Sequence, residues 1–344
     1  RKIIMSKDIN NNLGFQTRAV HKGNGIDKET GAIKRPITMA NSYELPYDPS
    51  DLNWSSAGKN LYTRNGGSNQ QYLQEKLASL EGGEDAVVLA SGVAALSGLF
   101  FALLKSGDHV IFSSVTYIAV YRLLNKLLNN KFGVETTIVD TSNVENVKKA
   151  IKPNTKLIHI ETPGNPTLTI SDIKAIAKVA HDNGALLSVD NTFASPYNQR
   201  PVELGADFTV ESLTKYINGH GDAMGGAIIG KKKYLDIIRA QSQINLGATI
   251  SPFNAWLIMR GSVTLPLRMK QHNDNALKVA KYLQTVKGVS FVAYPGLENL
   301  PNHQIAKEQM TNGYGGVLSF GLRADHDTYN RVVSHLNVLH QQFL

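Results

Sequence analysis

Residues 85–113, DAVVLASGVAALSGLFFALLKSGDHVIFS, decide the fold because they predict a strand, a helix and a second strand in direct succession. Ala86–Ala90 is a short apolar run that predicts a buried strand, and His109–Ser113 predicts the next one. Between them, Gly92–Leu104 carries apolar side chains at helical spacing. Two buried strands joined by a helix are typical of a parallel sheet that helices cover.

The same alternation continues along the chain. A helix is predicted around Tyr117–Asn129, and another at Val144–Ile151. A further helix is predicted with Ser171 as its N-cap and Gly184 in the C′ position after its end. The remaining strands are predicted at residues 135–140, 156–161, 185–190, 206–212 and 227–230. This pattern predicts an α/β protein with a mainly parallel central sheet, in which ligands bind at the carboxyl ends of the strands.

The chain divides into three predicted parts. Residues 1–60 are rich in Asn, Pro, Gly and Ser, and predict an extended arm that packs on something else, often another subunit. Residues 61–252 carry the strand–helix alternation. Residues 253–344 begin with a long helix and continue with weaker alternation at 289–294 and 316–322. We expect a large domain followed by a smaller C-terminal α/β domain.

The composition excludes several kinds of site and partner. The 344 residues include no cysteine, which excludes disulfides, thiolate metal sites and cysteine nucleophiles, and we predict no metal site. No apolar run is long enough to cross a bilayer, and residues 1–12 lack the apolar core of a signal peptide, so we expect a cytoplasmic protein without a membrane partner. A nucleic-acid-binding protein is an alternative that rests only on the formal charge of +8. Because the basic residues are scattered along the chain, we predict no nucleic-acid partner.

Three predicted strand ends carry groups suited to a flat, phosphorylated ligand. Gly92 opens a helix, whose first N–H groups suit a phosphate, or it simply makes a tight turn. Tyr117 follows a strand and either stacks on a ring or belongs to the core. Asn165 lies in the turn TPGNP, where it either donates to a phenolic oxygen or is an ordinary loop residue.

Two further strand ends supply a carboxylate and an amine. Asp190 ends an apolar strand and needs a cationic partner, which a pyridinium nitrogen, a lysine, an arginine or a helix cap would provide. Lys215 lies just beyond the next strand, and is either an imine-forming amine or a surface lysine. Together, in this order, the five groups are what an aldehyde cofactor with a ring nitrogen and a phosphate requires.

The segments around the carboxylate and the amine carry the most specific pattern. Residues 189–196 read VDNTFASP, and residues 212–222 read SLTKYINGHGD. They resemble the diagnostic segment of the pyridoxal-phosphate (PLP)-dependent enzymes of cysteine and methionine metabolism. This family includes cystathionine γ-synthase, cystathionine β- and γ-lyases, methionine γ-lyase and O-acylhomoserine sulfhydrylase. The resemblance runs from about Gly14 to Leu322 and implies the aspartate aminotransferase-like fold of PLP-dependent transferases, fold type I, with pyridoxal 5′-phosphate as cofactor.

The resemblance also implies a role for each candidate residue. Lys215 would form the Schiff base with PLP and later move protons, and Asp190 would pair with the pyridine nitrogen. Tyr117 would stack on the ring and assist proton transfer at the leaving group, while Asn165 would lie near the ring hydroxyl. The implied phosphate-binding residues are Gly92, Val93, Ser212 and Thr214.

Two residues of the N-terminal region are implied to act in another subunit. Tyr62 and Arg64, in LYTR, would reach the phosphate of a neighbouring subunit's cofactor. Arginine suits this role because its planar group of donors matches a phosphate. The resemblance accordingly implies a homotetramer, built as a dimer of dimers.

The sequence departs from the family pattern in three places. Gly67-Ser68-Asn69 stands where Asn-Pro-Thr is common, and Ile118-Ala119-Val120 stands where Gly-Gly-Thr or Gly-Cys-Thr is common. In the family both stretches border the substrate pocket, so these departures leave the identity of the substrate undetermined. The carboxylate-binding arginine of the family and the Ser-Leu-Gly-Gly-like segment before it have no counterpart before the end of the chain, HQQFL at residues 340–344. We therefore expect a C-terminal domain that is truncated or altered at its end.

The predicted function is a PLP-dependent carbon–sulfur lyase of sulfur amino-acid metabolism. It would act on a small sulfur amino acid such as cystathionine by α,γ- or α,β-elimination, and the cystathionine γ-lyase type is favoured by general resemblance. One alternative is γ-replacement, as in cystathionine γ-synthase or O-acylhomoserine sulfhydrylase. Another, of a different class, is a non-catalytic PLP-fold protein that serves binding or assembly.

Overall fold

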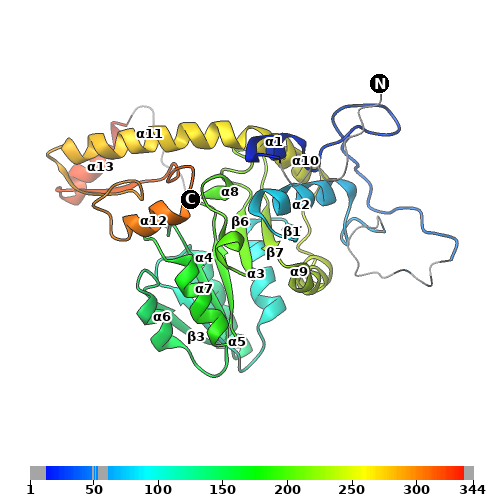
Figure 1. Cartoon of the computed structure of the whole chain (residues 1–344), viewed down its shortest axis with the longest axis horizontal. Helices are drawn as coiled ribbons and strands as arrows, with labels where there is room; N and C mark the ends of the chain where they lie inside the picture. Colours follow the sequence, from blue (N-terminus) through cyan, green and yellow to red (C-terminus); the bar gives the residue numbers. More distant parts are fainter. Residues whose placement is uncertain (1–12, 49, 51, 53–60, 337–344) are drawn as a thin grey trace.

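The computed structural model describes residues 13–48, 50, 52 and 61–336. Within these residues, seven strands form one sheet in the order β1-β7-β6-β5-β4-β2-β3 (Figure 1). The strands are β1 (Asp85–Leu89), β2 (His109–Ser113), β3 (Glu135–Val139), β4 (Thr155–Glu161), β5 (Leu186–Asp190), β6 (Phe208–Ser212) and β7 (Gly226–Gly230). The pairs from β3 across to β6 are parallel, and β7 is antiparallel to β6 and β1. The predicted mainly parallel sheet is confirmed.

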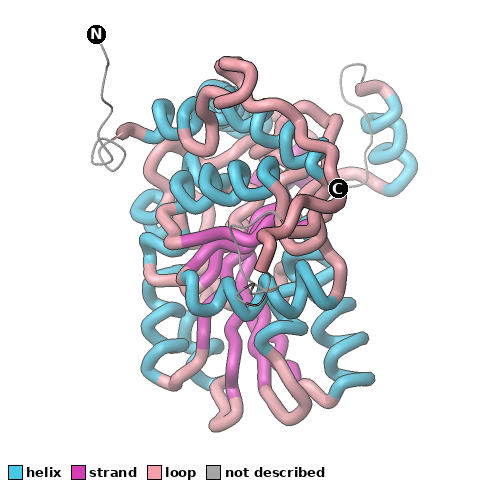
Figure 2. The backbone as a smooth tube through the Cα atoms, turned by 90° about the vertical axis from the view of Figure 1, so that its right-hand side faces the viewer, coloured by secondary structure: helices cyan, strands magenta, loops and turns pink. Residues whose placement is uncertain are grey.

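Helices cover both faces of this sheet, as Figure 2 shows with the strands lying between them. Successive side chains of a strand point to opposite faces of the sheet, so an apolar strand needs a cover on both faces. Val87 and Leu89 pack in a core with helix α3 (Gly92–Leu103). Ala86 and Val88 belong to a second core, under helix α2 (Ser68–Glu81). Strand β1 is therefore buried on both faces, as its unbroken apolar sequence requires, whereas the edge strand β3 is partly exposed.

The helices that accompany the sheet follow its strands in chain order. The helices up to the end of the sheet region are α1 (Phe15–His21), α2 (Ser68–Glu81), α3, α4 (Ile118–Tyr121), the π-helix η2 (Arg122–Leu128), α5 (Asn129–Phe132), α6 (Val144–Ala150), α7 (Ile173–Asp182), α8 (Ser195–Asn198), the 3₁₀ helix η3 (Pro201–Leu204), α9 (Lys232–Ile238) and the π-helix η4 (Arg239–Asn245). The helix predicted around residues 117–129 is thus a succession of α4, η2 and α5.

The N-cap predicted for helix α7 is wrong by one residue. The cap is Asp172, whose Oδ1 accepts a hydrogen bond from the backbone N–H of Ala175 at 2.9 Å. Ser171 is buried instead, and its hydroxyl bonds that of Thr141 at 2.7 Å. Both residue types are good N-caps, and the tertiary contact decides between them. Gly184 follows the helix with a φ of 70°, which confirms its predicted C′ position.

After the sheet, a run of helices leads to a second, small sheet (Figure 1, yellow to red). Strands β8 and β9 form an antiparallel pair where the sequence shows weaker alternation. The elements of this part are α10 (Pro252–Gly261), the 3₁₀ helix η5 (Ser262–Thr264), α11 (Leu265–Thr285), β8 (Val289–Ala293), α12 (His303–Gln309), β9 (Ser319–Leu322) and α13 (His326–Ser334). The expected alteration at the C-terminal end falls on residues 337–344, outside the described residues.

The described part of the predicted arm, within residues 13–52, packs on its own chain. It contains helix α1 and therefore is not extended throughout. The backbone N–H of Thr38 and the carbonyl of Pro36 both bond the side chain of Asn69 in α2. The carbonyl of Arg35 accepts from Trp256 in α10 at 3.0 Å. These contacts hold the described stretch against α2 and α10.

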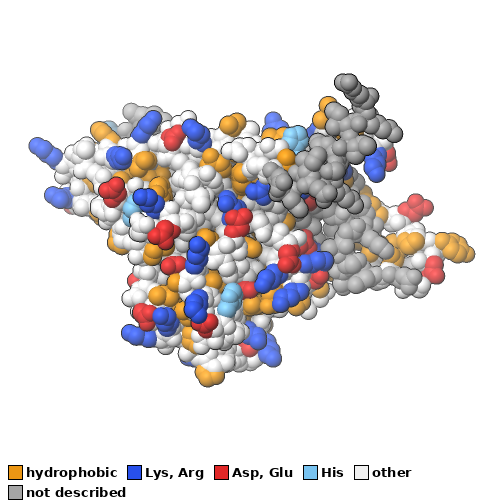
Figure 3. All heavy atoms as spheres, viewed as in Figure 1, with side chains coloured by type: hydrophobic (Ala, Val, Ile, Leu, Met, Phe, Trp, Pro, Cys, Tyr) orange, Lys and Arg blue, Asp and Glu red, His pale blue; other side chains and the backbone are white. Residues whose placement is uncertain are grey.

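The face shown in Figure 3 has no concentrated group of basic side chains among the residues that are coloured there. Figure 3 shows Lys and Arg side chains spread among acidic and neutral ones over the face in view. None of the helices in the described part of the chain combines the length and the apolar character that a bilayer crossing requires.

Candidate active site

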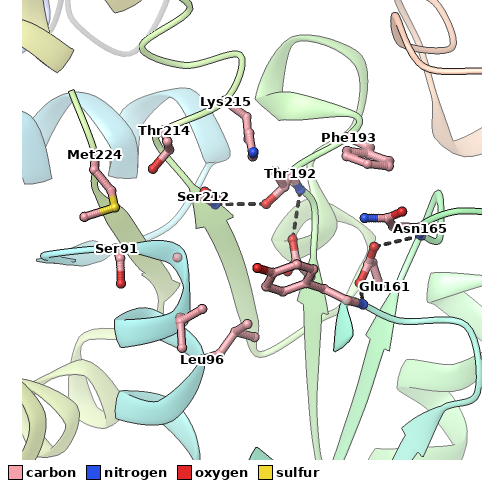
Figure 4. A pocket seen from close by; sticks show the side chains of 14 residues that line it. Ser91, Leu96, Glu161, Asn165, Thr192, Phe193, Ser212, Thr214, Lys215 and Met224 are labelled. Atoms are coloured by element: carbon pink, nitrogen blue, oxygen red, sulfur yellow. Dashed lines mark hydrogen bonds between the residues drawn. The ribbon is translucent and has the colours of Figure 1, made fainter. Parts of the chain in front are cut away.

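A cavity of about 200 Å³ opens at the carboxyl ends of the parallel strands. Strands β4 and β5 end side by side there, with Glu161 and Asp190 as register partners, and β6 ends next to them at Ser212. The cavity is lined by Ser91, Gly92, Val93, Leu96, Tyr117, Glu161, Asn165, Asp190, Thr192, Phe193, Ser212, Thr214, Lys215 and Met224 (Figure 4). Eight of the ten predicted site residues are among them.

Lys215 lies in the turn that follows β6. Its backbone N–H donates to the carbonyl of Ser212 at 3.2 Å, and its carbonyl accepts from Gly219 at 2.8 Å, so both of its backbone groups are fixed. Figure 4 shows the side chain directed toward the space that Ser212 and Thr192 border. In the described part of the chain no carboxylate lies within 4.0 Å of its amine. The amine therefore faces the cavity without a salt bridge.

Asp190 is a buried carboxylate that lacks a cationic partner within the described residues. It is 7% exposed, and its Oδ1 accepts the backbone N–H of Thr192 at 3.1 Å. Burial raises the pKa of this carboxyl, and the hydrogen bonds from Thr192 act in the opposite direction. A buried charge of this kind is costly unless a cation meets it. The carboxylate lines the cavity, so a ligand there is able to provide that cation.

The N-terminus of helix α3 forms one wall of the cavity. Ser91 is its N-cap and accepts from the backbone N–H of Ala94 at 3.0 Å. A Cβ added at Gly92 would lie 2.8 Å from the Cβ of Ser212, so the close approach of the first residue of α3 to the end of β6 requires a glycine. Thr214 also lines the cavity, and its hydroxyl forms hydrogen bonds with the backbone carbonyl and N–H of Gly225 at 3.3 and 3.2 Å. Helix N–H groups and hydroxyls together suit a phosphate.

Glu161 is a cavity residue that sequence reasoning did not single out. Its Oε2 accepts from the backbone N–H of Tyr117 at 2.6 Å, and its Oε1 accepts from that of Asn165 at 2.8 Å. Burial, and then the neighbouring Asp190, raise its pKa to about 8. The sequence did carry an indication, because Glu161 ends the apolar strand KLIHIE just as Asp190 ends ALLSVD.

Tyr62 and Arg64 are the two predicted site residues that do not line this cavity. Tyr62 is 39% exposed, and the guanidinium of Arg64 lies 5.1 Å from the centre of its ring. The carbonyl of Arg64 accepts from the side chain of Gln243 in η4 at 3.2 Å. Within the same described ranges, no group of three or more His, Asp or Glu side chains is arranged to hold a metal ion.

Comparisons with known proteins place this site in a family. The family model described as "Cys/Met metabolism PLP-dependent enzyme" matches residues 16–342. A canavanine γ-lyase of Rhizobium leguminosarum bv. trifolii is 56% identical over 328 residues, which are 95% of this chain and 82% of the relative. An L-methionine γ-lyase of Porphyromonas gingivalis is 39% identical over 340 residues, 97% of this chain and 84% of the relative.

A solved structure agrees with the family match. The crystal structure of a cystathionine γ-lyase from Lactobacillus plantarum, complexed with L-serine, has a TM-score of 0.85 and 38% identity. It covers 90% of this chain, which spans 79% of that structure. The predicted fold, fold type I of the PLP-dependent transferases, is confirmed, as is the predicted enzyme class, a PLP-dependent lyase of sulfur amino-acid metabolism.

The cavity fits PLP on its own chemistry. The buried carboxylate of Asp190, which has no cationic partner among the described residues, suits the ring nitrogen. Gly92 and Ser212 lie in close contact at the N-terminus of α3, and helix N–H groups suit a phosphate. The free amine of Lys215 suits the aldehyde. With a family model that spans nearly its whole length and relatives of this identity, the chain belongs to the PLP-dependent enzymes of cysteine and methionine metabolism.

Proposed function

We propose that this lyase acts at the γ-carbon of an amino acid that carries a sulfur or oxygen leaving group there. The relatives named canavanine γ-lyase and L-methionine γ-lyase support the γ position. The canavanine γ-lyase is 56% identical to this chain, and canavanine carries an oxygen at its γ-carbon. We therefore add oxygen-linked substrates to the sulfur-linked ones that the sequence predicts. The observation that carries the proposal is that a lysine and a buried carboxylate, neither with an oppositely charged partner among the residues that the structure describes, open onto one cavity.

The proposed cofactor-binding roles follow the chemistry of each group. Bound PLP supplies an aldehyde for covalent attachment and a ring that takes up electrons from the α-carbon. Lys215 would hold the aldehyde end, Asp190 the ring nitrogen, and Tyr117 one face of the ring. Asn165 would lie near the ring hydroxyl. The phosphate would be held by Gly92, Val93, Ser212 and Thr214.

Two side chains are proposed to move protons. We assign removal of the α-proton to Lys215 Nζ, because it is an amine without a carboxylate partner in the described residues. We assign delivery of a proton to the leaving sulfur or oxygen to the Tyr117 hydroxyl. Leu96, Val93 and Met224 give part of the wall an apolar character, which favours the exclusion of water. With a sulfur substrate, elimination and hydrolysis yield a thiol, ammonia and a 2-oxo acid.

We also propose a homotetramer in the cytoplasm, with Tyr62 and Arg64 binding the phosphate in a neighbouring subunit. Their position away from their own chain's cavity supports this assignment. Light scattering would give the subunit number. Coexpression of Arg64→Ala with Lys215→Ala subunits is expected to restore part of the activity, because one mixed site then carries both native residues. Without any restoration, the sharing of sites between subunits would be refuted.

A substrate panel tests the reaction. Canavanine, methionine, homocysteine and cystathionine should each be followed for loss of substrate and release of the γ-substituent by chromatography. O-acylhomoserine with cysteine or sulfide tests for γ-replacement in the same way. Release of the γ-substituent without a thioether product supports the γ-lyase. Formation of the replacement product as the faster reaction, a thioether with cysteine or homocysteine with sulfide, would instead identify a γ-replacement enzyme.

A further inference from the structure

One carboxyl group joins two loops of the active site. Glu161 is 7% exposed and ends β4 beside Asp190. Its Oε2 accepts two hydrogen bonds, from the backbone N–H of Tyr117 at 2.6 Å and from the hydroxyl of Thr116 at 3.1 Å. Its Oε1 accepts the backbone N–H of Asn165 at 2.8 Å. Both oxygens of a single side chain are therefore occupied by donors from different loops.

These two loops carry the residues assigned to one face and one edge of the cofactor ring. Tyr117 follows β2 and precedes the short helix α4, whose N-terminus has no side-chain cap. Asn165 follows β4. The backbone N–H groups of both end on the carboxyl of Glu161, as the dashed line to Asn165 in Figure 4 illustrates. A change in the carboxyl would leave one or both of these partly buried donors without a partner, which is costly.

We propose that Glu161 is a positioning residue, whose carboxylate fixes Tyr117 and Asn165 relative to each other and thereby sets the affinity and orientation of the PLP ring. The inference rests on the proposed roles of those two residues. Glu161 acts through their backbones, because its hydrogen bonds go to main-chain N–H groups and to Thr116.

The charge of Glu161 is consistent with this role when the cofactor is present. Only an ionised carboxyl accepts freely on both oxygens, as its three donors require. Burial and the neighbouring Asp190 raise its pKa to about 8. A cationic ring nitrogen beside Asp190 would offset the second of these causes and favour the ionised form.

The decisive variant is Glu161→Gln. Glutamine has nearly the same size but a single acceptor oxygen, so its NH₂ group must face one of the two backbone donors. Glu81→Gln is the matched control, because it also removes a buried carboxyl but one that does not line the cavity. For each protein we would measure the dissociation constant of PLP from the apo form, the circular dichroism band of bound PLP, and the melting temperature of the apo form.

We expect Glu161→Gln to bind PLP about 10- to 100-fold more weakly, as the loss of one hydrogen bond to a charged group predicts. The dichroism band, which reports the asymmetric setting of the ring, should change in shape or intensity. Glu81→Gln should keep the native band and an affinity within about twofold of native, a difference too small to reflect a lost hydrogen bond. Glu161→Asp keeps the charge, but its side chain is one methylene shorter. Its affinity for PLP should lie between those of Glu161→Gln and Glu81→Gln.

Native affinity and a native band in Glu161→Gln would overturn the proposal. An equal loss of affinity in Glu81→Gln would also overturn it, because the effect would then come from any buried carboxyl. Neither readout requires turnover. A native protein that binds PLP but cleaves no γ-substituted amino acid would refute the proposed function and leave the test of Glu161 intact.

Discussion

Replacement of Asp190 by asparagine should change two properties in opposite directions. The carboxyl is 7% exposed, accepts the N–H of Thr192, and has no cation within 4.0 Å in the described residues, so burial raises its pKa. Without cofactor, an uncharged amide of the same shape removes that burial cost. The apo form of Asp190→Asn should therefore be at least as stable as the native apo form.

With cofactor, the same replacement would remove the proposed hydrogen bond between the carboxylate of Asp190 and a cationic ring nitrogen. Such bonds contribute about 1.5–3 kcal/mol, so PLP should bind roughly 10- to 150-fold more weakly. The measurement is a PLP titration of apo Asp190→Asn by absorbance, with urea unfolding of both apo forms. A structural role for Asp190 predicts the reverse, a destabilised apo form that binds PLP with native affinity. That result would refute the pairing of this carboxylate with the ring nitrogen.

Three further changes have outcomes that follow from single contacts. Burial raises the pKa of Glu81 from 4.5 to about 7, so the folded state keeps a proton that the unfolded chain releases, and the stability that this group contributes is full below about pH 4.5 and is lost as the pH rises through 7. Urea unfolding should therefore show a weaker dependence of stability on pH in Glu81→Gln than in the native protein. Gly92→Ala places a Cβ 2.8 Å from Ser212 and should weaken the binding of PLP and of inorganic phosphate, whereas Gly288→Ala, which meets no atom within 4 Å, should not change either affinity. Borohydride reduction followed by peptide mapping should find the pyridoxyl group on Lys215, and Lys215→Ala should carry none; a label on another lysine would refute the assignment.

The strand ends were predictable because the chemistry of each is local. An apolar run that ends in a charged or hydroxyl residue can be recognised without knowledge of its neighbours. Asp190 and Lys215 are predictable in this way, and both line one cavity. The alternation of strands and helices also predicted the mainly parallel sheet, because buried parallel strands must be apolar on both faces.

Contacts between distant segments were not predictable in the same way. Ser171 and Asp172 are equally good N-caps by residue type, and the hydroxyl of Thr141, 30 residues away, engages the serine. The π-helix η2 interrupts a segment whose sequence predicts an ordinary helix. Each of these outcomes depends on packing partners that a local pattern does not contain.

Asp190 and Glu161 differ in how far along the chain their hydrogen-bond partners lie. Both carboxyls end apolar strands, and by burial alone they are equivalent. Their hydrogen-bond partners distinguish them. Asp190 accepts a hydrogen bond from the backbone N–H of Thr192, two residues later, whereas Glu161 accepts one from the backbone N–H of Tyr117, 44 residues earlier in the chain. The second contact exists because β2 and β4 are neighbours in the sheet, an order that the sequence alone does not specify. A carboxylate at a strand end is thus a local feature, but the loops that it joins are set by the order of the strands.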